Sequence, residues 1–402
     1  MLKGNGKKWL AILLATVMLA AVFVGCKPAQ SDPGTSDPGQ SGTENQFDGE
    51  IVLGACSDLS GSGASNGEGE AKAYQMVADM INAEGGVMGK KLVIKQEDTQ
   101  GTVEGSVNAI NRQFSDKNVV GVFGFMYSSQ VMGISDIAKE AGRPVLYGGS
   151  SPSIWELNNP WLFRMRPNDQ LMVTLAVEYV FQEMGAKKLG MIYSMDDYGT
   201  QAYEVAKGYC EKNGKELIAD GYTVGAKDYY SQLLTLKNAG CDTMLLWGHE
   251  EEYAILVRQR LELDYNVPVF GSNGIGNPDF NNLVSTEESE GIVAIGESCP
   301  GNQWEYFTEF EQQYKAKFNG ESPNNNVCSL VPAIYLYCDA IERAQSTDPA
   351  KVAEALRETK DFPAITGYLT CDSNQDFCHS GIVYEMKNGE RSFIDLFSVD
   401  PE

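Results

Sequence analysis

The chain has 402 residues, of which 43% are apolar and 10% aromatic, and its 55 acidic and 31 basic residues give a formal charge of −24. This apolar content is enough for a large core and excludes global disorder, and the length predicts two or three domains. The acidic balance argues against nucleic acid as a partner, because a basic face for phosphates could not readily be assembled.

The first 26 residues are typical of a lipoprotein signal peptide. Three lysines precede the apolar run 9–24, which is shorter than the ~20 residues that a membrane-spanning helix needs. Phe23-Val24-Gly25-Cys26 then resembles the lipobox of bacterial lipoproteins, with Phe where Leu is usual. We predict a signal peptide over residues 1–25, lipidation at Cys26 and an extracytoplasmic, membrane-anchored protein. The alternative is an uncleaved anchor helix, which leaves the rest of the chain on the same side of the membrane.

Residues 26–48 are predicted to form a linker. The sequence SDPG occurs at 31–34 and again at 36–39, among Ser, Gly, Thr, Gln and Asn. Proline and glycine at this density oppose helix and strand alike, so the segment should be a solvated tether. The folded body is expected to begin at residue 49.

Strand and helix patterns alternate along the first part of the body. The first helix has Met76, Val77 and Met80 on one face, and Gly85-Gly86 ends it. The β-α-β-α-β-α-β order predicts a parallel sheet with helices on both faces. The predicted strands are 51–54, 92–94, 119–123 and 144–147, and the predicted helices are 73–81, 103–114 and 131–137.

The same alternation starts again after residue 168. The two units together predict an α/β fold of two doubly wound, Rossmann-like lobes with a cleft between them, where loops at the carboxyl ends of the strands meet. Asn388-Gly389 predicts the turn of a final hairpin. The predicted helices are 171–184, 201–213, 229–239, 253–263, 304–319 and 327–344, and the predicted strands are 189–193, 243–247, 267–270, 291–295, 382–386 and 392–397.

Several motifs in this order resemble a known family. They are Asp58-Leu59-Ser60-Gly61, residues 79–89, Asp196-Asp197-Tyr198-Gly199 and residues 228–242. The body resembles the type I solute-binding proteins of ABC transporters, in the branch typified by the leucine/isoleucine/valine-binding protein. The resemblance implies capture of a small polar solute, such as an amino acid, organic acid or amide, and its delivery to an ABC permease. It implies a monomer without cofactor or metal, and not an enzyme.

The resemblance also implies how the chain is divided between the lobes. Three crossing strands should form the hinge, near Asn168, Pro300 and Cys371. Lobe I is expected to contain residues 49–168 and 301–370, and lobe II residues 169–300 and 371–397.

Candidate ligand-binding residues follow several of the predicted strands. Backbone N–H groups at a helix start favour an anion, and glycines allow the backbone to approach a ligand closely. In the family, the loop with Ser128 and Ser129 and the loop 148–150 of lobe I hold the ligand's carboxylate and part of its ammonium group. The alternative makes Ser128 a simple N-cap and Gly148-Gly149 a plain turn. The candidates are Asn66, Tyr127, Ser128, Ser129, Gly148, Gly149 and Ser150 in lobe I, and Tyr198, His249 and Asn273 in lobe II.

Asn273 lies where the amino-acid binders of this family often have an acid, and His249 replaces a covering aromatic residue. A buried ammonium without an ionic partner costs several kcal/mol. We therefore predict that leucine, isoleucine and valine are not bound in the family's usual way. Either Glu250 or Glu297 supplies a substitute carboxylate, or the ligand lacks an ammonium group there, or the alignment of this glycine-rich loop is slipped.

Other functions are less well supported by the sequence. Gly61-Ser62-Gly63 lacks the spacing of a dinucleotide loop, and Asp372, Asn374 and Asp376 begin like a calcium loop that lacks its glycine and glutamate. A hydrolase is a weak alternative, because no GxSxG motif occurs and the chain has only two histidines. A ligand-sensing receptor role not tied to transport is the other alternative. Cys371 and Cys378 could form a disulfide if their strands pair.

Overall fold

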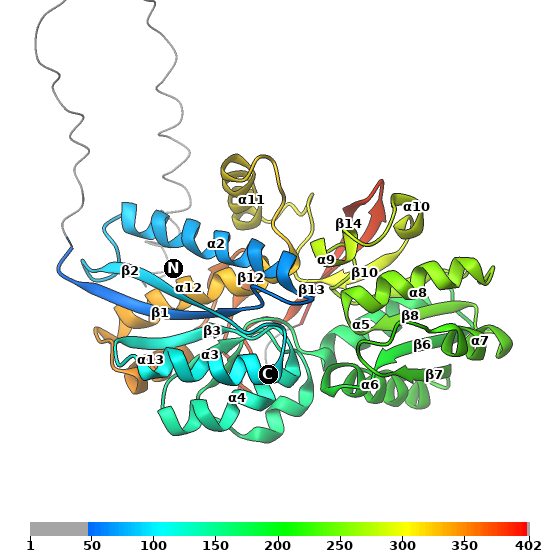
Figure 1. Ribbon diagram of the computed structural model, residues 1–402, viewed down its shortest axis with the longest axis horizontal. Coiled ribbons are helices and arrows are strands. Elements are labelled where there is room, and N and C mark those ends of the chain that lie inside the picture. The colour runs from blue at the N-terminus through cyan, green and yellow to red at the C-terminus, as the bar shows by residue number, and fades with distance from the viewer. Residues whose placement is uncertain (1–46, 400–402) are drawn as a thin grey trace, which may run out of the picture.

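The computed structural model describes residues 47–399, which fold into two α/β lobes that lie side by side (Figure 1). The predicted signal peptide, the lipidation site Cys26 and nearly all of the predicted linker lie outside the described residues. Between residues 47 and 399, no helix is both long enough and apolar enough to cross a membrane.

The first lobe is built on a parallel five-stranded sheet of order β2-β1-β3-β4-β5. Its central strand β3 (Val119–Gly124) is buried at every residue, as expected for a strand covered by helices on both faces. The other strands are β1 (Glu50–Ser57), β2 (Lys91–Asp98), β4 (Val145–Tyr147) and β5 (Leu162–Arg164), and the helices between them are α2 (Ala64–Ala83), α3 (Val103–Ser115), α4 (Ser128–Ala141) and the short η1 (Pro152–Leu157).

A later segment of the chain returns to this first lobe. Helix α12 (Asn325–Ala344) is apolar around most of its circumference and buried along nearly its whole length, because it packs against α2 and against strands β3 and β4 of the sheet. The phenol of Tyr337 in α12 donates to the carbonyl groups of Val122 and Pro144 across the sheet. Helices α11 (Glu305–Lys317) and α13 (Pro349–Arg357) and the hairpin of β11 (Phe362–Ala364) and β12 (Gly367–Leu369) complete the returning segment.

The second lobe is built on a seven-stranded sheet of order β14-β13-β10-β9-β8-β6-β7, in which only β13 and β14 run antiparallel to their neighbours. The strands are β6 (Lys188–Ser194), β7 (Glu216–Tyr222), β8 (Thr243–Trp247), β9 (Val269–Gly271), β10 (Val293–Gly296), β13 (Ser380–Lys387) and β14 (Glu390–Ser398). The helices are α5 (Asp169–Gln182), α6 (Asp197–Asn213), α7 (Tyr230–Asn238), α8 (Glu250–Glu262), α9 (Pro278–Asn281) and α10 (Thr286–Ser289).

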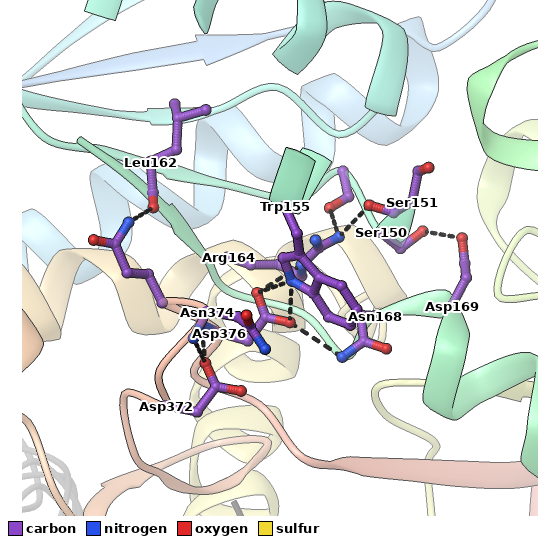
Figure 2. Close-up of polar contacts among 12 residues, drawn as sticks. Ser150, Ser151, Trp155, Leu162, Arg164, Asn168, Asp169, Asp372, Asn374 and Asp376 are labelled. Atoms are coloured by element: carbon purple, nitrogen blue, oxygen red, sulfur yellow. Dashed lines mark hydrogen bonds and ion pairs between the residues drawn. The ribbon is translucent and has the colours of Figure 1, made fainter. Parts of the chain in front are cut away.

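Two buried ion pairs tie together the three segments that cross between the sheets. The Arg164 guanidinium, at the end of β5, lies 2.8 Å from the Asp376 carboxylate in the segment before β13, and neither side chain is exposed (Figure 2). Arg166, two residues further along the first crossing, lies 2.8 Å from Glu297 after β10. A buried charge without a partner would be costly. Each pair therefore holds the crossing segments in a fixed position relative to one another.

The loop with the partial calcium pattern forms a turn between β12 and β13. Asp372 Oδ1 accepts the backbone N–H groups of Asn374 and Asp376, each at 2.8 Å. Asp376 in turn accepts from Arg164 and, at 3.1 Å, from the amide of Asn168 (Figure 2). The carboxylates of this loop therefore serve as turn and ion-pair acceptors.

The possible Cys371–Cys378 disulfide is not formed, because all eight cysteines between residues 47 and 399 are free thiols. The Cys371 thiol faces the carbonyl of Asp372 and the Cys378 thiol that of Ser380, so the two side chains point to different partners. The sequence patterns also missed β5, β7, β11 and β12. These strands are short or only half-buried, and their apolar runs are weak.

Candidate ligand-binding cleft

A small cavity of about 30 Å³ lies among residues that follow the carboxyl ends of parallel strands in the two sheets. Residues of both sheets and of the first crossing segment line it. The side chains that matter for its chemistry are Tyr127, Ser128, Arg166, Tyr198, His249, Glu250 and Asn273. A larger cavity of about 330 Å³ adjoins it at Tyr127, His249 and Glu250 and opens to solvent. The two walls are in direct contact, since Asn66 of the first lobe donates to Glu250 of the second and the Tyr127 and His249 rings pack together.

The wall from the first lobe is formed by the turn from β3 into α4. Gly124 adopts φ of +135°, and a Cβ there would lie 1.9 Å from the Cys56 carbonyl oxygen, so this turn requires glycine. The turn leads to the start of α4, where the backbone N–H groups of Ser128 and Ser129 have no partner among the described residues. Such orphaned donors, together with the helix dipole, attract an anionic group.

The wall from the second lobe is organised around His249 at the end of β8. Its Nε2 lies 2.6 Å from Asp196 Oδ2, and Asp196 also caps α6 by accepting from the backbone of Gly199. The His249 ring contacts the Tyr127 ring of the other lobe edge-on, with centroids 5.1 Å apart, and lies 5.7 Å from the Tyr198 ring. His249 therefore bridges the two walls of the cleft.

The His249–Asp196 pair is held in its charged form. Burial alone would lower the pKa of His249, but the hydrogen bond and the negative charge of Asp196 outweigh it and raise the pKa to about 9. Burial raises the pKa of Asp196, and its bonds to His249, Gly199 and Ser194 more than reverse this and lower it to about 2. At neutral pH the cleft thus contains an imidazolium group beside a carboxylate.

The Glu250 carboxylate lines both cavities and lacks an ionic partner among the described residues. Its Oε1 accepts from the amide groups of Asn66 at 3.2 Å and Asn277 at 3.3 Å, and it forms no ion pair with any described residue. Burial raises the pKa of the Glu250 carboxyl, although the nearby positive charge of His249 opposes this rise. A cationic group of a ligand at this position would find a negative partner that the protein has left uncompensated.

Arg166, which is paired with Glu297, forms part of the cavity wall. Arg166 is 5% exposed and lines the cavity, whereas Glu297 lies behind it and is fully buried. Burial lowers the pKa of Arg166, but the negative charge of Glu297 raises it by more than burial lowers it, so the guanidinium remains charged. Burial raises the pKa of Glu297 against the opposing effect of Arg166.

The structure brings most of the sequence-predicted site residues to these two cavities. Tyr127, Ser128, Ser129, Tyr198, His249 and Asn273 line one or both of them. Asn66 lies beside them and binds Glu250.

The predicted loop of Gly148, Gly149 and Ser150 lies behind the residues that line the cavity. Met126 covers Gly148, because a Cβ on Gly148 would lie 2.3 Å from the Met126 sulfur. Ser150 donates to Asp169 at 2.8 Å (Figure 2). These three residues therefore line neither cavity.

Sequence reasoning did not assign roles in the cleft to Met126, Arg166, Asn277 or Asn326. Arg166 follows β5, a strand of three residues whose pattern was not recognised, so the position at its carboxyl end carried no signal. Asn326 comes from the buried helix α12, whose start approaches the cleft only through the tertiary fold. Of the two glutamates considered as substitute carboxylates, Glu297 is engaged by Arg166 and Glu250 lines the cavity.

These features are those of a type I solute-binding protein, and the comparison with protein families agrees. The model of the periplasmic binding protein family matches residues 50–390. The chain belongs to this family, whose members are substrate-binding proteins rather than enzymes.

Individual relatives are distant but cover most of the chain. A Leu/Ile/Val-binding protein homolog from Brucella melitensis is 27% identical over 81% of this chain and 88% of its own length. A leucine binding protein from Thermotoga maritima has a similar structure, with a TM-score of 0.81 at 21% identity over 87% of this chain and 99% of its own. A branched-chain amino acid transporter substrate binding protein from Streptococcus pneumoniae, in complex with isoleucine, has a TM-score of 0.79 at 23% identity over 88% and 100%. The solved structures establish the likeness of fold.

Proposed function

We propose that this protein is the extracytoplasmic, lipid-anchored solute-binding component of an ABC importer. It captures one small polar solute by closure of its two lobes and presents the closed form to a permease. The observation that carries the proposal is the convergence of polar groups from both lobes and the first crossing segment on one cavity, with His249 and Tyr127 in contact across it. A solute that contacts both walls stabilises the closed form by its differential affinity for that form.

The chemistry of the cleft favours a zwitterionic or anionic solute. The free N–H groups at the start of α4 can receive a carboxylate, and Glu250 can receive an ammonium group. Asn273 is neutral, so its side chain cannot supply the acid that the family resemblance implies at this position. An amino acid held through Glu250 is therefore the solute class that these groups serve best.

Titration calorimetry on the purified full-length chain in detergent tests both statements. A panel of amino acids, organic acids and amides should contain a solute that binds with one-to-one stoichiometry. Glu250→Gln should lower the affinity for an amino acid by about tenfold or more and leave the affinity for its deaminated 2-oxo analogue nearly unchanged. Only the amino acid has an ammonium group that pairs with the Glu250 carboxylate. Glu287→Gln, on the exposed turn α10, is the matched control.

Two results would contradict the proposal. The first is the absence of binding across the whole panel. The second is tight leucine binding that survives Glu250→Gln and Glu297→Gln alike, because leucine would then be held without a carboxylate partner and the neutral Asn273 would have no bearing on specificity.

A further inference from the structure

Arg166 is a cation that faces the ligand cavity with hydrogen-bonding capacity to spare. Its Nε lies 2.8 Å from Glu297 Oε1, in an ion pair that lacks hydrogen-bond geometry. The two terminal nitrogens have no hydrogen-bond partner among the described residues, although the side chain is only 6% exposed. Buried guanidinium groups normally satisfy most of their five donors, so free terminal nitrogens at a cavity wall need a partner from outside the chain.

The counter-ion of Arg166 does not neutralise it toward the cavity. Glu297 is fully buried and is not among the residues that line the cavity. The other acid nearby, Asp169, accepts from the hydroxyl of Ser150 and likewise does not line the cavity. A ligand in the cavity therefore meets the positive face of the Arg166–Glu297 pair.

The position of Arg166 is separate from the anion-binding groups of the first lobe. Those groups are the N–H donors at the start of α4, which belong to Ser128 and Ser129. Arg166 belongs to the crossing segment between the lobes and lines the cavity beside Asn273. The cleft thus has two sites for anionic groups, and the carboxylate of Glu250, which can bind an ammonium group, lines the same cavity.

From these relationships we infer that Arg166 is a specificity-determining residue that binds a second carboxylate of the solute, so that the preferred solute is a small dicarboxylate. An acidic amino acid and its deaminated analogue share this chemistry and differ only at Glu250. The inference rests on the proposed function, since it assigns a ligand class to the same cleft. A guanidinium binds a carboxylate through two parallel, charge-assisted hydrogen bonds, which a neutral amide cannot reproduce.

The test compares acids with their neutral isosteres. Titration calorimetry on the full-length chain in detergent uses L-glutamate against L-glutamine, L-aspartate against L-asparagine, and glutarate as the dicarboxylate without an amine. At least one acid should bind about tenfold more tightly than its amide. L-Glutamate against glutarate then separates the amino acid from the deaminated solute.

The variant pair is chosen so that the fold survives. Arg166→Gln alone would leave Glu297 buried and unpaired, so the double variant Arg166→Gln/Glu297→Gln removes both charges at once with side chains of similar size. It should bind the acid about tenfold less tightly and lose the preference for acid over amide. Arg112→Gln/Glu97→Gln removes an ion pair whose residues line neither cavity and is the control.

The outcomes separate this inference from the proposed function. If the wild-type protein binds a neutral amino acid as tightly as the acids, the role of Arg166 is refuted while solute binding stands. The same holds if the double variant keeps the full preference for the acid, because the pair is then only a structural tie of the hinge. If no solute of any class binds, both proposals fail.

Discussion

The carboxylate of Asp279, in the second lobe, accepts the backbone N–H groups of Ser65 at 3.2 Å and Asn66 at 3.1 Å at the start of helix α2 in the first lobe. These are the donors that an N-cap side chain normally satisfies, and the residue at that position, Gly63, has no side chain to do so. The cap of one lobe's helix is thus supplied by the other lobe. Opening of the cleft would break it.

Asp279→Asn should therefore weaken ligand binding without unfolding the protein. Loss of a charged cap costs roughly 1 kcal/mol, which corresponds to an affinity about fivefold lower because only the closed form contains the contact. Calorimetric titration of the solute that binds the wild type measures the change. Asp136→Asn, an exposed aspartate on α4, is the control. Equal losses in the two variants would show that the contact across the cleft has no part in closure.

The His249–Asp196 pair predicts a defined dependence of stability on pH. The pKa of His249 is raised from its ordinary 6.5 to about 9, so its contribution is complete below pH 6.5 and is lost as the pH rises through about 9. The pKa of Asp196 is lowered from 3.8 to about 2, so its contribution is present above pH 3.8 and is lost as the pH falls through about 2.

Urea unfolding of wild type and His249→Gln from pH 5 to pH 10 measures this contribution as the difference between the two proteins. We expect a difference of roughly 2 kcal/mol below pH 6.5 that shrinks toward zero above pH 9. The proton resonances of His249 offer a direct check. A His249 resonance that titrates near 6.5 would refute the charged pair.

The buried Arg164–Asp376 pair should be essential to the hinge. Asp376→Ala leaves a guanidinium that is fully buried without its ion partner, at a cost of about 3–5 kcal/mol in unfolding free energy. Glu97→Ala breaks an ion pair with Arg112, which is half exposed, and should cost less than about 1 kcal/mol. Urea unfolding monitored by circular dichroism compares the two, and similar costs would contradict a structural role for the buried pair.

The fold followed from the sequence because its signals are strong where the elements are long and buried. Helix α12 is buried along nearly its whole length and strand β3 at every residue, and the Asn388-Gly389 turn closes the hairpin of β13 and β14 as its type requires. Strand β5 has three residues, and β7 is largely half-buried, so neither produces a clear apolar pattern. Short strands of this kind are formed by pairing in the sheet rather than by local preference.

The site was only partly predictable, and the reason is geometric. Ser128, Tyr198 and His249 follow strands or begin helices that the sequence indicated, and they line the cavity. Arg166 follows the unrecognised strand β5. Burial by a neighbouring side chain has no local sequence signal either, so the covering of Gly148 by Met126 could be seen only in three dimensions.

The most direct measurement of the central claim is a thermal melting screen of the full-length chain in detergent, with amino acids, dicarboxylates, other organic acids, amides and short peptides. A solute present at a hundred times its dissociation constant should add about 2.7 kcal/mol to the unfolding free energy, since only the folded state binds it, and should raise the melting temperature by a few degrees. We predict such a shift for at least one small carboxylate-bearing solute. A melting temperature that no member of the panel changes would contradict capture of a small polar solute by this cleft.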